Sequence, residues 1–246
     1  MPALLFVFCE LISHAGLVRP HIFPAPTKVV RTAVDLTFHG TLPRDLLVSL
    51  LRAAAGWLIG ASLGGVLGVL AGFSTTARAL IDRNVQMIRS IPFLALLPLA
   101  IVWFGVGEAQ KIFMVALGVF FPIYINVILG IRQLDVKLLE LAQVQRLSSW
   151  ETIKLVILPG ALPSVLTGVR YSLATAWLAL VVAETIGASA GIGFLAIDAR
   201  EFLRTDVIVL TLVIYAGIGA LADTAAKLLE RRMLRWHPSY AADRPR

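Results

Sequence analysis

Charged residues are scarce in this sequence. Only 15% of its 246 residues are Asp, Glu, Lys or Arg, whereas an ordinary soluble domain carries roughly 25%. Hydrophobic residues make up 58% of the chain, and the mean hydropathy is +0.84. So much apolar surface has to face lipid, and we therefore expect a membrane protein.

Cysteine and ordered metal-ligand spacings are also lacking. Cys9 is the single cysteine, which excludes a disulfide framework within the chain. The histidines His14, His21, His39 and His237 show no ligand spacing, so no metal site is predicted. The chain also has no G-x-x-x-x-G-K-[ST] loop after a strand, so we expect neither a bound cofactor nor ATP hydrolysis by this chain.

Basic residues exceed acidic ones and give a net charge of +7. They lie between apolar runs, not on one solvated face, so nucleic-acid binding is not expected. Segments 74–89 and 132–160 and the C-terminal tail hold 13 Lys and Arg, against 7 in 19–44, 107–111 and 187–206. The positive-inside rule then places both termini in the cytoplasm.

The apolar runs predict an all-α, polytopic membrane fold with about six transmembrane helices. A run near 2–18 is at the lower length limit for a span; a signal peptide is the alternative, although it lacks a basic region and a cleavage site. A short amphipathic helix at the membrane interface is expected within 19–44. The remaining expected spans are 46–73, 91–105, 112–131, 164–186 and 207–221.

Two further features qualify these spans. Segment 74–89 is polar and is expected to be a cytoplasmic loop, while Pro92 and Pro98 predict a bent or broken helix in 91–105. In 46–73 a glycine recurs at every fourth residue, which forms one shallow stripe and predicts close packing against another helix. These helix-packing glycines are Gly56, Gly60, Gly64, Gly68 and Gly72.

The longest charge-bearing amphipathic passage runs over 140–163. We expect two short helices there, the second starting at a capping box formed by Ser148 and Glu151. Pro159 is expected to end that helix, and Pro163 to lie in the first turn of the next span. The passage should form a compact knob projecting into the cytoplasm.

A few polar residues lie inside the predicted spans. An ionisable group such as Glu184 is costly there, so we expect a structural or gating role, paired with a basic residue such as Arg200 or Arg204, at a helix end that water reaches. Lining a pathway is the less favoured alternative for Glu184. Tyr124 and Asn126 either line a pathway or form a helix–helix hydrogen bond. Arg89 and Arg170 fit positive-inside anchors.

The 140–163 passage resembles the cytoplasmic EAA loop of permease subunits of bacterial ABC importers. Glu140, Ala142, Val156, Leu158 and Pro159 match that motif at the right spacing. Arg146 takes the position of the usual glycine, where a non-glycine residue costs about 1–2 kcal/mol in a left-handed turn. Between the matching positions lie Leu147, Ser148, Trp150 and Glu151.

The resemblance extends over almost the entire chain after about residue 20. MIRSIPFLALLPLAIVWFG, FPIYINVILGIRQLD, VILPGALPSVLTGVR, AWLALVVAETIGASAGIGFLA and LERRMLRWHPSY are similar to the nitrate/sulfonate/taurine branch, most closely the aliphatic sulfonate permeases. This implies the type I importer (MetI-like) permease fold. It divides the chain into a first helix and interfacial segment (1–45), a permease core (46–236) with its coupling loop (137–163), and a cytoplasmic tail (237–246).

The resemblance also implies a division of labour in the bacterial inner membrane. Two permease copies form the pathway, two cytoplasmic ATPase subunits bind ATP and dock on the coupling loops, and a periplasmic binding protein delivers an aliphatic sulfonate. Taurine, nitrate or a nitrogen heterocycle remain alternative substrates. An ATP-independent secondary transporter would need inverted repeats and paired intramembrane charges, and an intramembrane enzyme a Ser/His or paired-carboxylate arrangement; neither pattern is clear in the sequence.

Overall fold

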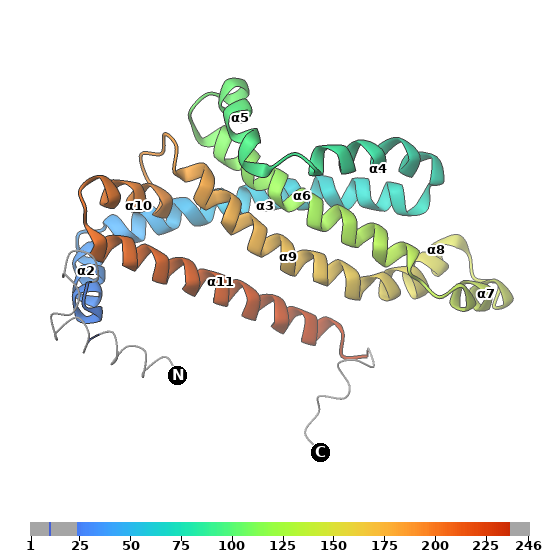
Figure 1. The fold of residues 1–246 in the computed structure, drawn as a ribbon. Helices are drawn as coiled ribbons and strands as arrows, with labels where there is room; N and C mark the ends of the chain where they lie inside the picture. The colour runs from blue at the N-terminus through green and yellow to red at the C-terminus, as the bar shows by residue number, and fades with distance from the viewer. Residues whose placement is uncertain (1–9, 11–23, 237–246) are drawn as a thin grey trace, which may run out of the picture.

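The structure, a computed structural model, describes residues 10 and 24–236 and shows an elongated bundle of long helices (Figure 1). No strand occurs in this part of the chain, which confirms the all-α fold. The helices are α2 (Pro26–Phe38), α3 (Thr41–Phe73), α4 (Thr75–Arg89), the 3₁₀ turn η1 (Phe93–Leu96), α5 (Leu97–Phe104), α6 (Glu108–Arg132), α7 (Val136–Val144), α8 (Ser149–Thr152), the π turn η2 (Ile153–Ile157), α9 (Leu158–Glu184), α10 (Ile192–Glu201) and α11 (Thr205–Met233).

Four described helices are long and apolar enough to cross a membrane: α3, α6, the continuous helix Ser149–Glu184, and α11. A fifth span results if α4 is joined to η1 and α5, which are bent by 95° relative to it. The break agrees with the one predicted from Pro92, whereas Pro98 lies in the first turn of α5 and does not interrupt it. The predicted first span 2–18 and the tail 237–246 lie outside the described residues.

The prediction of a loop at 74–89 is wrong, because Thr75–Arg89 forms the helix α4. Its first turn is capped by Ser74, whose Oγ accepts a hydrogen bond from the Ala77 backbone N–H at 3.1 Å. The helix contains no proline or glycine, and it buries Val85 against its neighbours. The polarity of this segment is that of an amphipathic helix with one buried face, not that of a loop.

The glycines of α3 face α6 at very short range. A Cβ atom at Gly60 would lie 2.2 Å from the Ala116 carbonyl oxygen, and one at Gly64 would lie 2.6 Å from the Phe120 carbonyl oxygen. Backbone and β-branched side chains of α6 therefore fill the groove that the missing side chains leave. Gly65 points elsewhere, and a Cβ atom there would meet nothing within 4 Å.

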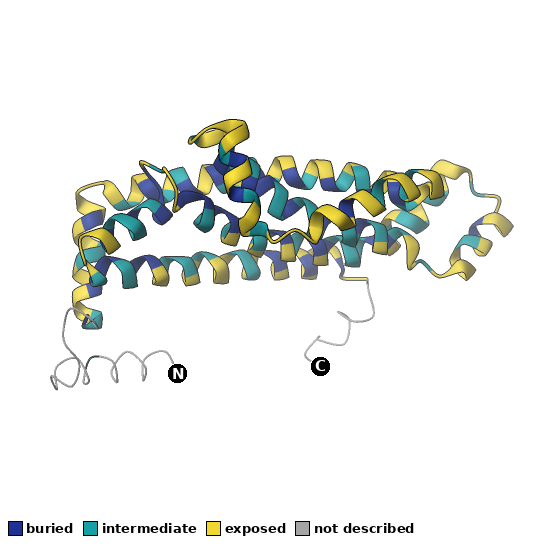
Figure 2. Cartoon of the chain, turned by 45° about the horizontal axis from the view of Figure 1, so that its top comes forward, coloured by how far each residue is buried: buried dark blue, intermediate teal, exposed yellow. Residues whose placement is uncertain are grey.

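α6 is the centre of the bundle, with α3 on one side and α9 on another. Small residues again permit the approach to α9: a Cβ at Gly130 would lie 2.7 Å from the Ala161 carbonyl oxygen. Figure 2 shows buried residues on the inner faces of the long helices and exposed residues on their outer faces. The main apolar cluster joins Val115, Val119, Ile123, Val127, Ala176, Ala179 and Leu180.

Candidate functional site: the 137–163 segment and a buried ion network

The 137–163 segment lies at one end of the bundle, beyond most of the long helices (Figure 1). α7 is capped by Asp135, whose Oδ1 accepts a hydrogen bond from the Lys137 backbone N–H at 2.9 Å. The carboxylate thus satisfies an otherwise unpaired donor and complements the helix dipole. The chain leaves α6 at Arg132 and enters α7 within three residues, so the segment is held close to a rigid span.

Arg146 has the left-handed conformation expected at the usual glycine position, with φ of 54°. The Leu147 N–H donates to the Ala142 carbonyl at 3.0 Å, and the Arg146 N–H donates to the Gln143 carbonyl at 2.9 Å. This pair of bonds is the Schellman motif, which ends a helix by satisfying its last carbonyls. The turn between α7 and α8 is therefore formed in full, with an arginine at its least favourable position.

α8 starts at the capping box expected from the sequence. The Ser148 Oγ accepts from the Glu151 backbone N–H at 3.3 Å, and the Glu151 Oε2 accepts from the Ser148 backbone N–H at 2.8 Å. The Ser148 hydroxyl also donates to Glu151 Oε2 at 2.6 Å. Two backbone donors at the start of α8 are thereby satisfied reciprocally.

The prediction that Pro159 ends this helix is wrong. Leu158 is helical (φ −61°, ψ −50°), and Ser149–Glu184 runs as one helix of 36 residues through the π turn η2. Proline removes a backbone donor and crowds the preceding turn, and a wider π turn accommodates this without breaking the helix. Pro163 accordingly lies inside α9, not in the first turn of a separate span.

Much of the apolar surface of the segment is unpartnered in the described chain. Ala142 is buried at 3% exposure, whereas Val144 is 79% and Trp150 is 71% exposed. Glu140 is also exposed, on α7. A protruding knob with apolar side chains and a carboxylate on its surface is the type of element that docks into a groove of another protein.

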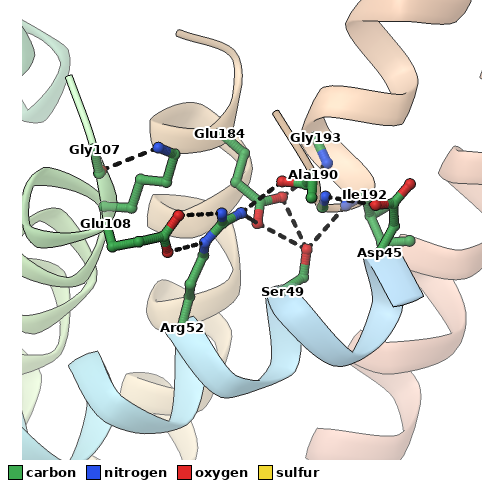
Figure 3. Close-up of polar contacts among 11 residues, drawn as sticks. Asp45, Ser49, Arg52, Gly107, Glu108, Glu184, Ala190, Ile192 and Gly193 are labelled. Atoms are coloured by element: carbon green, nitrogen blue, oxygen red, sulfur yellow. Dashed lines mark hydrogen bonds and ion pairs between the residues drawn. The ribbon is translucent and has the colours of Figure 1, made fainter. Parts of the chain in front are cut away.

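Glu184 lies at the opposite end of α9, in a buried polar cluster (Figure 3). It is only 2% exposed. Its carboxylate accepts from Arg52 Nη1 at 2.8 Å, from the Ser49 hydroxyl at 2.8 Å and from the Gly193 N–H at 2.8 Å. The predictions of access to water and of a partner at Arg200 or Arg204 are therefore wrong: the partner is Arg52 of α3, and bonded groups surround the carboxylate.

The same cluster fixes the 185–191 loop and the start of α10 to α3. Arg52 Nη1 also donates to the Ala190 carbonyl at 2.7 Å, and its Nε and Nη2 donate to the carboxylate of Glu108 at the start of α6. The Gly191 N–H donates to Asp45 Oδ1 at 3.0 Å. Three spans and one loop are thus joined by a hydrogen-bonded network, which is how a buried charge is tolerated.

Sequence reasoning missed Asp45, Ser49 and Arg52. Their spacing contains the signal, because they lie at helical intervals on the same buried stripe of α3 as Gly56 and Gly60. The stripe is polar at one end and consists of glycine further along. Three polar residues continuing a packed face point to buried polar contacts and not to solvent.

Of the other polar residues of the spans, one contacts its own helix and two contact a neighbouring helix. Asn126 Nδ2 donates to the Pro122 carbonyl in its own helix at 2.8 Å. Tyr124 is fully buried, and its hydroxyl donates to Asp82 Oδ1 of α4 at 3.4 Å, a contact between helices. Arg170 is not a simple anchor: its Nε donates to Asp223 Oδ1 of α11 at 2.7 Å, which joins α9 to α11.

Known proteins resemble this chain over most of its length. Residues 64–235 match the family described as binding-protein-dependent transport system inner membrane component. The chain is 44% identical over 240 residues to the putative aliphatic sulfonates transport permease protein SsuC of Bacillus subtilis (98% of this chain, 87% of that protein). It is 48% identical over 240 residues to SsuC of Escherichia coli (98% and 91%) and 33% identical to the E. coli taurine transport system permease protein TauC (96% and 87%).

A solved structure supports the fold. The chain resembles a chain of the MetNI methionine ABC transporter in an inward-facing conformation, with a TM-score of 0.52, 20% identity, and coverage of 75% of this chain and 92% of the other. This likeness concerns the arrangement of the helices, which is the predicted MetI-like one. Taken with the family match, it shows that the chain belongs to the inner membrane components of binding-protein-dependent ABC transport systems: a multi-pass membrane subunit, not an enzyme.

Proposed function

We propose that this chain is the transmembrane subunit of an ATP-driven importer of aliphatic sulfonates in a bacterial inner membrane. The observation that carries the substrate class is the identity of 44% and 48% to two sulfonate permeases over 98% of the chain, against 33% to a taurine permease. Taurine, itself a sulfonate with an added amine, is the second candidate. The chemistry common to both is recognition of a singly charged sulfur oxyanion.

The 137–163 segment is proposed as the site where a cytoplasmic ATPase subunit docks. Its support is the exposed apolar surface around Val144 and Trp150, together with the exposed carboxylate of Glu140. Because α8 continues through η2 into α9, a movement of the docked knob is transmitted along one helix toward Glu184. In this proposal the segment from Glu140 to Pro159 converts nucleotide-driven closure of the ATPase into movement of the spans.

The complete transporter is proposed to contain two copies of this chain, two ATPase subunits and a periplasmic binding protein. The 137–163 segment then faces the cytoplasm, and the Glu184 network faces the periplasm. The concentration of Lys and Arg in the segments on the 137–163 side supports this orientation. Proposed boundaries are 46–236 for the permease core and 137–163 for the coupling loop.

Docking is tested by Glu140→Ala, Trp150→Ala and a deletion of residues 150–154. Each is expected to reduce co-purification of the ATPase and to abolish sulfonate uptake, while the chain still inserts. Trp103→Ala is the matched control, because Trp103 is 62% exposed on α5, outside the segment. Full uptake by both the Glu140→Ala variant and the deletion variant would refute the docking role.

A further inference from the structure

A cavity of about 440 Å³, lined by both polar and aliphatic residues, lies between α4 and α6. Arg132, which lines it, is the last residue of α6, three residues before the cap of α7. The cavity is therefore at the end of the bundle that carries the 137–163 segment. Its other polar lining comes from Arg78, Asp82 and Gln86, all on α4. Neither the Glu184 network nor the 137–163 segment includes any of these residues.

The cavity has an excess of positive charge. Arg78 and Arg132 face a single carboxylate, Asp82, so the lining residues carry a formal charge of +1. Within residues 24–236 neither arginine forms an ion pair. Arg78 is half-buried. Arg132 is exposed. Because one carboxylate balances only one of the two arginines, a positive charge remains beside apolar surface, and the cavity favours an anion.

The rest of the lining is apolar and belongs to α6. Ile125 and Leu129 lie within two helical turns of Arg132, and Leu129 is 40% exposed. Basic groups thus lie at the end of the helix, and an aliphatic surface continues from them toward the membrane interior. A small soluble anion would contact only the basic groups and not the aliphatic surface. A molecule with an anionic head and a hydrocarbon chain fits both parts.

We propose that this cavity binds the phosphate headgroup of an anionic phospholipid of the inner leaflet. Basic pockets between transmembrane helices on the cytoplasmic side are suited to such headgroups. Arg78 and Arg132 hold the phosphate oxygens, the Gln86 amide donates a further hydrogen bond, and one acyl chain follows Ile125 and Leu129. The proposal rests on the orientation given under the proposed function, but not on the transported substrate.

Lipid binding by the purified full-length chain in an uncharged detergent tests the proposal. Native mass spectrometry would measure binding of phosphatidylglycerol and of phosphatidylcholine with the same acyl chains. We expect preferential binding of phosphatidylglycerol, and a loss of about 30-fold in its affinity in the Arg78→Gln/Arg132→Gln variant, the effect of two basic contacts. Asp82→Asn should instead strengthen the binding, because it removes the one carboxylate of the cavity.

The matched control is Arg31→Gln/Arg83→Gln, which removes the same charge from two exposed positions outside the cavity. It should bind phosphatidylglycerol like the unmodified chain, and all variants should keep the same thermal midpoint. An equal loss of phosphatidylglycerol affinity in both double variants would mean that the lipid binds through general surface charge, and this would refute the proposed site. Displacement of the lipid by millimolar methanesulfonate would identify a site for a soluble oxyanion and would likewise overturn the lipid assignment.

Discussion

Arg52 of α3 and Glu184 of α9 form an ion pair with 2.8 Å between Nη1 and Oε1, and their side chains are 5% and 1% exposed. The pair joins two helices through residues that are 132 positions apart in the chain. Its remaining bonds go to Ser49, Glu108, Ala190 and Gly193, so the loop after α9 and the start of α6 are held by the same charges. Burial away from water makes such a pair very sensitive to the loss of one partner.

Glu184→Ala should therefore destabilise the protein by about 3–5 kcal/mol, because the Ser49 hydroxyl and the Gly193 N–H lose their buried acceptor and Arg52 loses one of its two counter-charges. Glu184→Gln keeps one accepting oxygen and should lose less. Thermal unfolding of the detergent-solubilised chain measures both. Glu108→Gln is the control and should lose less than Glu184→Ala, because its side chain is 60% exposed and its amide oxygen still accepts from Arg52. An alanine variant as stable as the unmodified protein would show that the pair contributes nothing.

Gly60→Ala should disrupt the contact of α3 with α6. The new Cβ would lie 2.2 Å from the Ala116 carbonyl oxygen, and overpacking of this kind costs about 1–3 kcal/mol. Gly65→Ala in the same helix meets nothing within 4 Å and should be neutral or slightly stabilising, since alanine is the better helix former. The yield of folded protein and its thermal midpoint compare the two variants. Equal effects would contradict the close helix packing.

Arg146→Gly tests whether the side chain or the backbone of this turn matters. Glycine adopts a φ of 54° without strain, so this substitution should stabilise the folded protein by about 1 kcal/mol. Transport should stay intact or improve. Arg146→Ala removes the same side chain but keeps the strained backbone, so its stability should not rise. Thermal unfolding and uptake are measured together. Complete loss of uptake in both variants would mean that the arginine itself contacts the ATPase.

Pro159→Ala should weaken the transmission from α8 to α9. Alanine restores the backbone donor, so the π turn at 153–157 is free to wind as a regular α-helix. The π turn accommodates one residue more than an α-helical turn does. Its conversion to α-helix therefore rotates α8 by about 100° relative to α9. Transported sulfonate per hydrolysed ATP should fall, while Pro163→Ala, inside regular α9, should leave this ratio unchanged. An unaltered ratio in the Pro159 variant would contradict transmission along a continuous helix.

Local rules and the resemblance predicted the features that depend on neighbouring residues. The positions of the four long spans α3, α6, α9 and α11, the capping box of Ser148 and Glu151, and the glycine spacing of α3 follow from periodicity and short-range hydrogen bonding. The partner of Glu184 does not follow from such local rules, because Arg52 is brought to Glu184 only by the packing of α3 beside α9. The helix through Pro159 was also missed, since the proline rule describes an average preference and a π turn satisfies it differently.

The central claim is import of aliphatic sulfonates driven by a separate ATPase. The most direct test reconstitutes this chain with its cognate ATPase and binding protein in liposomes and measures ATP hydrolysis with alkanesulfonates, taurine and nitrate. We expect the strongest stimulation with alkanesulfonates, and its loss with Glu140→Ala. Stimulation by nitrate alone, or uptake without the ATPase, would contradict the account.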